Sequence, residues 1–391
     1  MRSVATGVFM PSAMYAGGTV KRNSEAVRSD LSLGNVLTAL EAREHFERDG
    51  QFAGERSLGP VRELLSALGD PHDAFEAIHV AGTEGKGSVA SFTAALLAAE
   101  GRDRPVGLYT SPHLVRLNER IRVDGRAIAD GHLAAALVAA MGAATERATW
   151  FDIVTAAAFH HFRRREVACA VVEAGLGGRL DSTSVVRSVV TVITRIGFDH
   201  AEVLGNTEME RAAEKAGIVR SGTPCVSGVA PDGDAGRVVE EACRASAAPL
   251  WRLGREVEVS RWARTDTGFR LDVSWPGGGA KGLRVDGPAR FQVGNLALAA
   301  AAVAASGREV ADGSQVQAVK GRLQPMAGHP AVFVDGGHTP AAVEAALTSV
   351  REVWGRPVAI LGCLADKDAA GMLRKAALHA RSVVVCGTPS A

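Results

Sequence analysis

The sequence predicts an α/β protein in which helices cover both faces of a mostly parallel sheet. Continuous apolar runs, such as residues 167–172 and 188–194, alternate with helical segments rich in alanine and leucine, as expected for strands buried on both faces. The first expected strand, residues 75–80, leads through a glycine-rich turn into a helix. Polar side chains directly follow several strands, and parallel sheets bind ligands beyond the carboxyl ends of their strands. We therefore expect a single crevice along that edge of the sheet.

The glycine-rich turn has the features of a phosphate-binding loop. Its glycines, Gly82, Gly85 and Gly87, allow backbone N–H groups to face inward without a Cβ atom in the way. The start of the following helix adds free N–H groups and a partial positive charge. Lys86 can reach the outer phosphates of a nucleotide, and Ser88 can place a hydroxyl near its metal ion.

The match to the standard P-loop pattern is incomplete. That pattern has four residues between its glycines and a Ser or Thr directly after the lysine. Here Thr83 and Glu84 alone separate the first two glycines, and a glycine follows Lys86. A plain structural turn is therefore an alternative, but the strand before it and the helix after it favour a P-loop ATPase-like domain.

Length, charge and cysteine spacing limit the class of protein. The 391 residues suit two domains. The 44 basic and 43 acidic side chains nearly cancel, so charge points neither to nucleic acid nor to an anionic membrane. The five cysteines are scattered without a Cys-x-x-Cys pair, which fits free thiols in a reducing cytoplasm. No apolar run is long enough to span a bilayer. We expect a cytoplasmic monomer without nucleic-acid or membrane partners.

The chain is expected to begin with a short extension, which is followed by the larger domain. Residues 1–35 lack a clear signal-peptide core and are interpreted as a loosely ordered extension, either a mis-called start or, less favoured, a cleaved leader. Residues 36–288 are expected to form the larger domain, in which residues 250–285 alternate in polarity and predict a small antiparallel insert. The other expected elements are helices at 36–46, 58–68, 89–100, 132–145 and 151–165, and strands at 75–80, 105–109, 167–172 and 188–194.

A second, smaller, Rossmann-like α/β domain is expected over residues 289–391, with its boundary near Gly287-Pro288. Its expected elements are a helix at 291–305, a strand at 332–334, a helix at 341–354 and strands at 358–361 and 382–386. Because the chain stops soon after the last strand, this domain is interpreted as short of its last elements.

Three further polar residues are placed to reach the same crevice as the glycine-rich turn. Ser111, Glu173 and His200 each follow a different expected strand. Hydroxyl and carboxylate oxygens with an imidazole fit Mg²⁺ or Mn²⁺ beside a nucleotide. Taken singly, Glu173 could be solvated or salt-bridged and His200 could be an ordinary histidine, but their joint placement favours a metal site.

Seven motifs together resemble the folylpolyglutamate synthase and dihydrofolate synthase family, within the Mur-type ligases. The resemblance extends from about residue 57 to the end of the chain. Each motif alone is weak, whereas the seven in this order are highly specific. The motifs are Gly82-Thr83-Glu84-Gly85-Lys86-Gly87-Ser88, Gly107-Leu108-Tyr109-Thr110-Ser111-Pro112-His113-Leu114, Asn118-Glu119-Arg120-Ile121, Glu173-Ala174-Gly175-Leu176-Gly177-Gly178-Arg179-Leu180-Asp181, Gly197-Phe198-Asp199-His200, Glu214-Lys215-Ala216-Gly217-Ile218 and Asp335-Gly336-Gly337-His338-Thr339-Pro340.

The resemblance implies an ATP-dependent ligase that joins L-glutamate to the carboxylate of a folate-type acid. In that family ATP phosphorylates the carboxylate, and the amine of glutamate attacks the acyl phosphate. Ser111, Glu173 and His200 match positions that bind two magnesium ions. Lys215 matches a lysine that reacts with carbon dioxide to form a carbamate beside the second metal; without the family match, a solvated helix residue is the favoured interpretation.

The resemblance also implies residues for the nucleotide and the acceptor. Catalysis in the family requires the two domains to close over ATP, which excludes water from the acyl phosphate. His338 matches a histidine near the incoming glutamate. The positions that match ATP-binding residues are Gly85, Lys86, Gly87, Ser88, Asn295, Arg322 and Asp335, and those expected near the pteridine substrate are Arg62, Trp150, Phe151, Asp152 and Asp181. For Trp150 and Phe151, a plain core role is an equal alternative.

The sequence departs from the family pattern at several positions. The family usually has Asn, sometimes Lys, where this chain has Glu84, and Ala and Asn where it has Gly337 and Thr339. Its C-terminus also extends further, and a basic residue often stands near the position of Asn295. We expect the Glu84 carboxylate to face the ATP phosphates, although it could point outward or pair with an arginine.

Several functions therefore stay open. The leading hypothesis is a folate-type ligase, and the sequence does not decide between adding the first glutamate to dihydropteroate and extending a glutamate tail. One alternative is a related ligase for a different acid. Another is a nucleotide-binding homologue without activity, which the intact Lys86, Glu173, His200 and Lys215 disfavour. A simple P-loop kinase is less favoured, because it needs neither the Lys215 motif nor a second domain.

Overall fold

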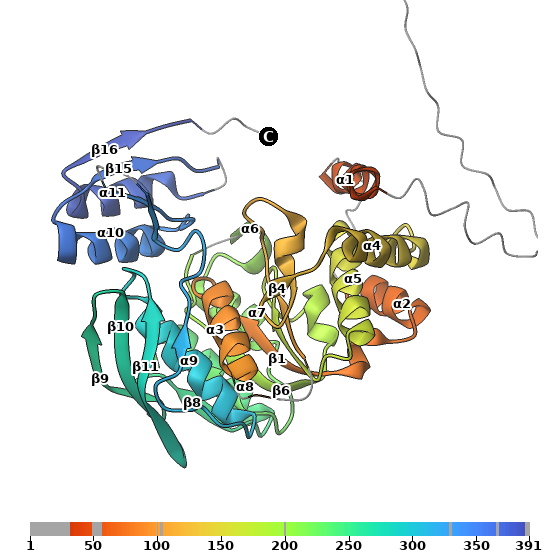
Figure 1. The fold of residues 1–391 in the computed structure, drawn as a ribbon, viewed down its shortest axis with the longest axis horizontal. Coiled ribbons are helices and arrows are strands. Elements are labelled where there is room, and N and C mark those ends of the chain that lie inside the picture. The colour runs from red at the N-terminus through yellow and green to blue at the C-terminus, as the bar shows by residue number, and fades with distance from the viewer. Residues whose placement is uncertain are drawn as a thin grey trace, which may run out of the picture.

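The computed structural model describes residues 32–48, 57–99, 101, 105–198, 201–327, 331–364 and 367–387. Most of the extension expected over residues 1–35 lies outside these ranges, and so do Asp199 and His200. The α/β class predicted from the sequence is confirmed, with a large, mostly parallel sheet and a smaller α/β unit at the C-terminal end (Figure 1).

Within the described ranges, eight strands form the large sheet in the order β4-β3-β2-β5-β1-β6-β7-β8. The strands from β2 to β8 in this order are parallel, whereas β3 and β4 add antiparallel pairs at one edge. Strand β5 ends on Glu173, and β1 ends directly before Gly82, so the two residues lie at the same edge of the sheet. The bounds are β4 Arg126–Ala127, β3 Ile121–Val123, β2 Val106–Tyr109, β5 Cys169–Glu173, β1 Glu76–Ala81, β6 Ser188–Ile193, β7 Cys225–Ser227 and β8 Leu250–Arg252.

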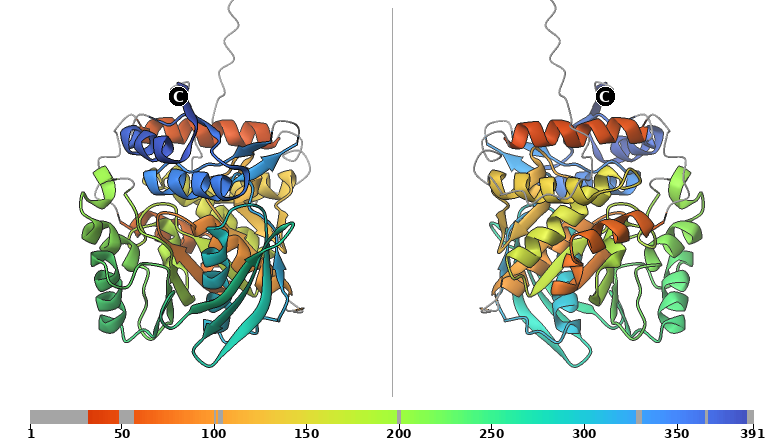
Figure 2. Two further views of the ribbon diagram at one scale, coloured as in Figure 1. Left: turned by 90° about the vertical axis from the view of Figure 1, so that its left-hand side faces the viewer. Right: turned by 90° about the vertical axis from the view of Figure 1, so that its right-hand side faces the viewer.

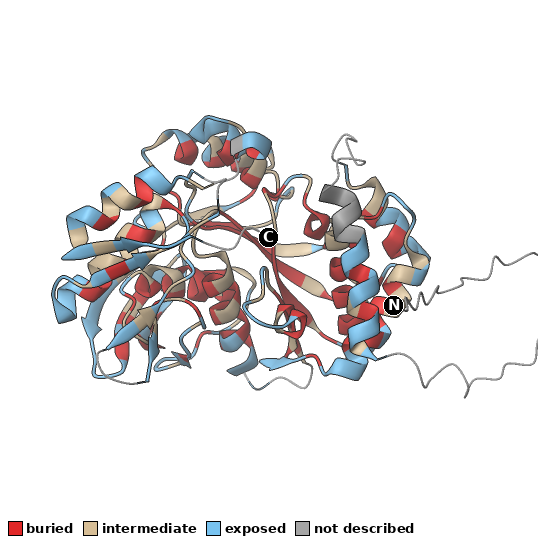
Figure 3. Cartoon of the chain, turned by 90° about the horizontal axis from the view of Figure 1, so that it is seen from above, coloured by how far each residue is buried: buried red, intermediate tan, exposed pale blue. Residues whose placement is uncertain are grey.

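Helices cover both faces of this sheet. Successive residues of its central strands point to opposite faces, and the side chains on both faces are largely apolar. Ile78 packs toward α3 (Lys86–Ala99) and α9 (Gln292–Ala305), whereas its neighbour Ala77 packs toward a second cluster on the opposite face. That second cluster is enclosed by α1 (Leu33–Arg48), α2 (Gly59–Ala67), α4 (Asp130–Ala143) and α5 (Trp150–Arg164). Short α6 (Ala201–Leu204) precedes α7 (Glu208–Ala216), which packs with α8 (Asp234–Ala245) near β7. Figure 3 shows the buried residues concentrated in the central strands and on the inner faces of the helices.

The antiparallel insert is confirmed, but it begins later than expected. Strands β9 (Glu258–Arg264), β10 (Gly268–Trp275) and β11 (Gly278–Asp286) pair antiparallel. The prediction that the insert starts at residue 250 is wrong, because β8 at Leu250–Arg252 pairs in parallel with β7 in the large sheet.

Helix α9 packs with the larger unit, although it follows the boundary expected near Gly287-Pro288. Its apolar side chains lie in the same buried cluster as α3 and the antiparallel sheet. The chain after it returns to this sheet, where β12 (Gln315–Val316) pairs with β11. We therefore propose that the boundary between the two units lies after β12 and not at residue 288.

The C-terminal unit contains the helices and strands expected from the sequence after residue 330. Helices α10 (Pro340–Trp354) and α11 (Ala369–His379) pack together through Val343, Met372 and Ala376. In the two views of Figure 2 this unit, drawn blue, stands at the top of the molecule. Its elements are β13 (Gln324–Met326), β14 (Val332–Val334), α10 (Pro340–Trp354), β15 (Val358–Leu361), α11 (Ala369–His379) and β16 (Ser382–Val385). Across the part of the chain that the structure describes, no helix combines the length and apolar character needed to cross a membrane.

Candidate active site

The glycine-rich loop connects β1 directly to the first turn of α3. Gly82 and Gly85 have positive φ angles of 147° and 90°, which glycine adopts without steric cost. A Cβ atom on Gly82 would collide with Thr194 Oγ1, and one on Gly85 would lie 2.7 Å from Asn295 Oδ1. The loop therefore approaches the end of β6 and the start of α9 so closely that a side chain at either glycine would be excluded.

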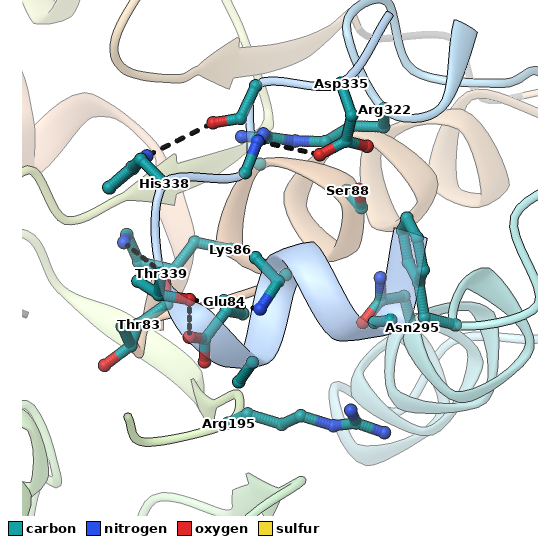
Figure 4. Close-up of a pocket in the computed structure, with 18 of the residues that line it drawn as sticks. Thr83, Glu84, Lys86, Ser88, Arg195, Asn295, Arg322, Asp335, His338 and Thr339 are labelled. Carbon is teal, nitrogen blue, oxygen red and sulfur yellow. Dashed lines mark hydrogen bonds between the residues drawn. The ribbon is translucent and has the colours of Figure 1, made fainter. Parts of the chain in front are cut away.

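A pocket lies between this loop and the C-terminal unit (Figure 4). Its empty space, which includes the part open to solvent, is about 840 Å³. All the residues that the sequence suggested for ATP line it, namely Gly85, Lys86, Gly87, Ser88, Asn295, Arg322 and Asp335. The free N–H groups at the start of α3 make this side of the pocket suitable for phosphates.

Glu173 lies at the carboxyl end of β5, directly beside the loop. It is buried, and its carboxylate oxygen Oε2 accepts a hydrogen bond of 2.9 Å from the backbone N–H of Ser111. A Cβ atom on Gly87 would lie 3.4 Å from the same oxygen. Burial raises the pKa of this carboxyl, and the nearby Lys86 opposes that rise. The structure thus brings together the loop, Ser111 and Glu173, as the order of the strands predicted.

Gln292 is a site residue that the sequence did not indicate. Its side-chain amide donates a hydrogen bond of 3.2 Å to Ser88 Oγ, and its Oε1 accepts one of 2.7 Å from Asn295. Gln292 is buried at the start of α9. A polar residue at the beginning of an Ala-rich apolar helix was the only available signal. Through this chain of hydrogen bonds, α9 orients both Ser88 and Asn295 toward the pocket.

The loop between β14 and α10 forms the opposite wall. Asp335 accepts hydrogen bonds of 2.7 Å from the backbone N–H groups of Leu323 and Gly337. His338 Nδ1 lies 3.1 Å from the carbonyl oxygen of Gly336. Figure 4 shows Asp335 and Arg322 together on the side of the pocket away from Lys86. Asp335 therefore shapes the turn that presents His338.

Glu84 lines the same pocket and contacts the C-terminal unit. Its Oε1 accepts a hydrogen bond of 2.8 Å from the hydroxyl of Thr339 (Figure 4). Its backbone forms a bridge with Arg195. The carboxylate is therefore turned toward the pocket, and a threonine hydroxyl, which the sequence did not suggest, binds it.

Lys215 is buried in the last turn of α7, where its side chain is 3 % exposed. The helix begins at a capping box in which Thr207 and Glu210 bind each other's backbone N–H groups. The interpretation of Lys215 as a solvated helix residue is wrong, because the side chain points into the protein. A buried lysine requires a compensating partner or chemistry that removes its positive charge.

The five residues suggested for the acceptor lie around the start of α5 and at the surface of α2. Arg62 is exposed on α2, and Arg120 stacks 4.8 Å above the Trp150 ring. Phe151 packs so close to Gly175 that a Cβ atom there would lie 2.6 Å from the ring. Trp150 and Phe151 also pack partly on the apolar cluster of α5, so their core role has support.

The carboxylates of Asp152 and Asp181 are held in local hydrogen bonds. Asp152 accepts bonds from the backbone N–H of Thr149, at 2.8 Å, and from Ser182 Oγ, at 2.6 Å. Asp181 accepts bonds from the N–H groups of Leu176, at 2.8 Å, and Thr183, at 3.0 Å. These bonds fix the loop after β5 against the start of α5, so the two aspartates shape this wall of the site.

The polar groups around Glu173 have the chemistry of a magnesium site. Ser88, Ser111 and Glu173 offer hard oxygen ligands, and Mg²⁺ usually combines one or two carboxylates with waters and phosphate oxygens. Among the described residues, no three His, Cys, Asp or Glu side chains cluster as a metal site by themselves. His200, the third metal ligand suggested by the sequence, lies outside the described residues. The residues present fit a cation that is shared with a nucleotide.

Comparison with protein families divides the chain into two matched regions. Residues 80–304 match the Mur ligase middle domain, and residues 321–391 match the Mur ligase glutamate ligase domain.

Individual relatives match most of the chain. Folylpolyglutamate synthase from Lacticaseibacillus casei is 36 % identical over 354 residues, which cover 85 % of this chain and 82 % of the relative. Dihydrofolate synthase/folylpolyglutamate synthase from Bacillus subtilis is 33 % identical and covers 83 % of this chain and 79 % of its own. A solved FPGS–AMPPCP–folate complex superimposes with a TM-score of 0.84 at 30 % identity, covering 92 % of this chain and 90 % of that one. Folylpolyglutamate synthase from Mycobacterium tuberculosis, solved with ADP and AMPPCP, gives a TM-score of 0.80 at 30 % identity over 91 % of this chain and 83 % of that one.

Proposed function

Since this chain belongs to the folylpolyglutamate and dihydrofolate synthase family of Mur ligases, we propose that it joins L-glutamate to the carboxylate of a folate-type acid at the expense of ATP. The family consists of ATP-dependent glutamate ligases. The observation that carries the proposal is the pocket between the two units, because every residue suggested for ATP lines it. Relatives solved with AMPPCP, ADP or folate support nucleotide and folate as the ligands.

The proposed reaction has two steps. The acceptor carboxylate attacks the γ-phosphorus of ATP, which gives an acyl phosphate and releases ADP. The amine of glutamate then attacks the acyl carbon, so that phosphate leaves and an amide bond forms. In this scheme the N–H groups of the loop and Lys86 bind the phosphates of ATP, and Arg322 and Asp335 bind the nucleotide from the C-terminal unit.

Magnesium is proposed to bind beside Glu173, Ser111 and Ser88, with His200 as a further ligand. When bound, it would neutralise negative charge on the transferring phosphoryl group. We propose that Lys215 carries a carbamate, formed when its neutral amine attacks carbon dioxide and loses a proton, which would replace a buried positive charge by an oxygen ligand. His338 is proposed to lie beside the incoming glutamate, from its place on the pocket wall.

The acceptor is proposed to lie near the start of α5, beside Trp150 and Phe151. A flat heterocycle could stack on the exposed part of either ring. Arg62 lies on the neighbouring α2, and Asp152 and Asp181 hold the walls in place. An assay with a panel of acceptors, described next, distinguishes dihydropteroate from an already glutamylated folate.

Ligase activity has a direct test with purified protein. ADP formation is expected to require both L-glutamate and a pteridine acid, and mass spectrometry is expected to show an acceptor that has gained one glutamyl unit. A panel of pteroate and folate acceptors with different tail lengths then assigns the first addition or the chain extension. ADP release that is equal with and without both substrates would contradict a folate ligase and favour a homologue of different activity.

The negative charge of Glu84 is expected to weaken ATP binding. Two unit charges about 6 Å apart repel by roughly 3 kcal/mol at an effective dielectric of about 20, and bound magnesium reduces this to about 1 kcal/mol. Glu84→Gln removes the charge and keeps an oxygen that can accept the Thr339 hydrogen bond. We expect the KM for ATP to fall several-fold, most clearly at low magnesium and low salt. An unchanged KM at every magnesium concentration would show that the carboxylate does not act on the phosphates.

A further inference from the structure

Helix α10 of the C-terminal unit is attached to the larger unit near its carboxyl end. The backbone N–H of Arg290 donates a hydrogen bond of 3.2 Å to Ser349 Oγ, and the Arg290 guanidinium lies 2.6 Å from a carboxylate oxygen of Glu352. Ala289 and Phe291 join the apolar cluster that contains Ala346, Val350, Leu323 and Phe333. This attachment combines apolar and ionic contacts and lies in the segment that joins β11 to α9 within the larger unit.

The amino end of α10 is attached through the Thr339 hydroxyl. Thr339 is 4 % exposed and is the N-cap of the helix, where its Oγ1 accepts a hydrogen bond of 3.1 Å from the backbone N–H of Ala342. The same hydroxyl donates its hydrogen to Glu84 Oε1. A hydroxyl has one donor and two acceptor positions, so one group can both cap α10 and bind the loop of the other unit.

The Glu84 side chain packs against the segment that follows β6, and the neighbouring Thr83 is hydrogen-bonded to that segment. A Cβ atom on Gly197 would lie 2.8 Å from Glu84 Oε1, so the carboxylate packs against the chain that follows β6. The neighbouring Thr83 is fixed there by two hydrogen bonds, from its N–H to the Arg195 carbonyl at 2.7 Å and from the Gly197 N–H to its Oγ1 at 3.0 Å. The Glu84 carboxylate is therefore a fixed point against which the C-terminal unit can be positioned.

The pocket runs along α10 between these two attachments, because Thr339, Ala342 and Ala345 line it. Ser349 lies ten positions after Thr339 along the helix, which corresponds to about 15 Å. A rotation about the Arg290 attachment would therefore move Thr339 further than Ala342 or Ala345, which lie nearer to Ser349 along the helix. The Thr339 contact therefore opposes such a rotation more effectively than a contact at either alanine would.

We propose that Glu84 and Thr339 are a positioning pair that holds the C-terminal unit over the phosphate-binding loop and so sets the placement of Asp335 and His338 before the nucleotide binds. The two residues lie 255 positions apart in the sequence, and the structure places their side chains in direct contact. The proposal rests on the proposed function for its consequence in catalysis, but the pair itself is tested without catalysis.

The test is a double-mutant cycle with Glu84→Ala and Thr339→Ala. Each change also has an effect of its own, because the first removes a charge from the pocket and the second removes a helix cap, and the cycle cancels both effects. The measurements are amide hydrogen exchange of residues 336–339 in the free protein and the Kd for a non-hydrolysable ATP analogue. Thr339→Ser keeps both hydrogen bonds and is the matched control.

In the parent, Glu84→Ala is expected to accelerate exchange at residues 336–339 about tenfold, the size of a hydrogen bond to a charged group. In the Thr339→Ala background it is expected to change exchange less than twofold, and the Thr339→Ser protein should match the parent. The Kd is expected to show the same non-additivity. If Glu84→Ala changes exchange and the Kd equally in the parent and in the Thr339→Ala background, the proposal that the two residues act as a pair is overturned. If the two substitutions are non-additive but the protein transfers no glutamyl group, the positioning pair is supported and only the proposed function is refuted.

Discussion

Lys215→Ala is expected to lower kcat by about a hundredfold or more while the protein remains folded. The side chain is buried in α7, and the proposed carbamate would be a direct ligand of a metal ion. Loss even of groups that only support metal ligands typically costs roughly 10–100-fold, so loss of a ligand should cost at least as much. Steady-state kinetics with saturating ATP, glutamate and acceptor measures the effect.

Two further variants distinguish the loss of the Lys215 amine from the loss of its packing volume. Lys215→Met keeps most of the buried volume and is expected to be as inactive as the alanine variant, because it also lacks the amine. Met209→Ala changes an exposed position on the same helix and is expected to retain parent activity. Acetate or formate should restore part of the turnover of the alanine variant by replacing the carbamate. Parent-like turnover of Lys215→Ala would refute the role of this residue.

Glu173→Gln is expected to lower kcat/KM by at least about a hundredfold. The proposed metal ion supplies several kcal/mol of charge stabilisation to phosphoryl transfer, and each 1.4 kcal/mol or so changes the rate about tenfold. The amide has the shape of the carboxylate but lacks its charge, so the magnesium dependence of turnover should weaken as well. Calorimetric titration of the protein with a magnesium–ATP analogue measures the lost binding directly. Unchanged magnesium dependence would contradict the assignment of Glu173.

The same substitution is expected to leave the fold at least as stable as the parent. Because burial raises the pKa of Glu173 above 4.5, the folded protein binds more protons than the unfolded chain between the two pKa values. The free energy of unfolding of the parent therefore falls as the pH rises through this window. In Glu173→Gln that contribution is absent, so the difference between the two proteins should grow in favour of the variant as the pH rises through this window and stay constant above the raised pKa. Thermal unfolding at several pH values tests the sign.

The sequence was most informative where local pattern and position in the sheet coincide. The apolar run at residues 167–172 predicted β5, and the observed strand ends on Glu173 at the edge where ligands bind. The run at residues 75–80 and the glycines after it predicted β1 and its loop for the same reason. Strands buried on both faces have a strong local signal, because most of their residues are apolar.

Features that depend on distant contacts were not predicted. Strands β7 and β8 are three residues each, too short for periodicity to distinguish them from loop. Helix α9 is apolar nearly all round, so its pattern indicates burial but not the unit that buries it. The hydrogen bonds of Gln292 with Ser88 and of Thr339 with Glu84 join residues 204 and 255 positions apart, and no local rule links such positions.

The central claim is that ATP activates the carboxylate of a folate-type acid in the pocket between the two units. It is tested most directly with an acceptor whose carboxylate carries the heavy oxygen isotope, incubated with the protein, ATP, magnesium and L-glutamate. Transfer through an acyl phosphate predicts that each phosphate released carries one labelled oxygen, in step with the glutamylated product. Release of unlabelled phosphate alone would contradict it.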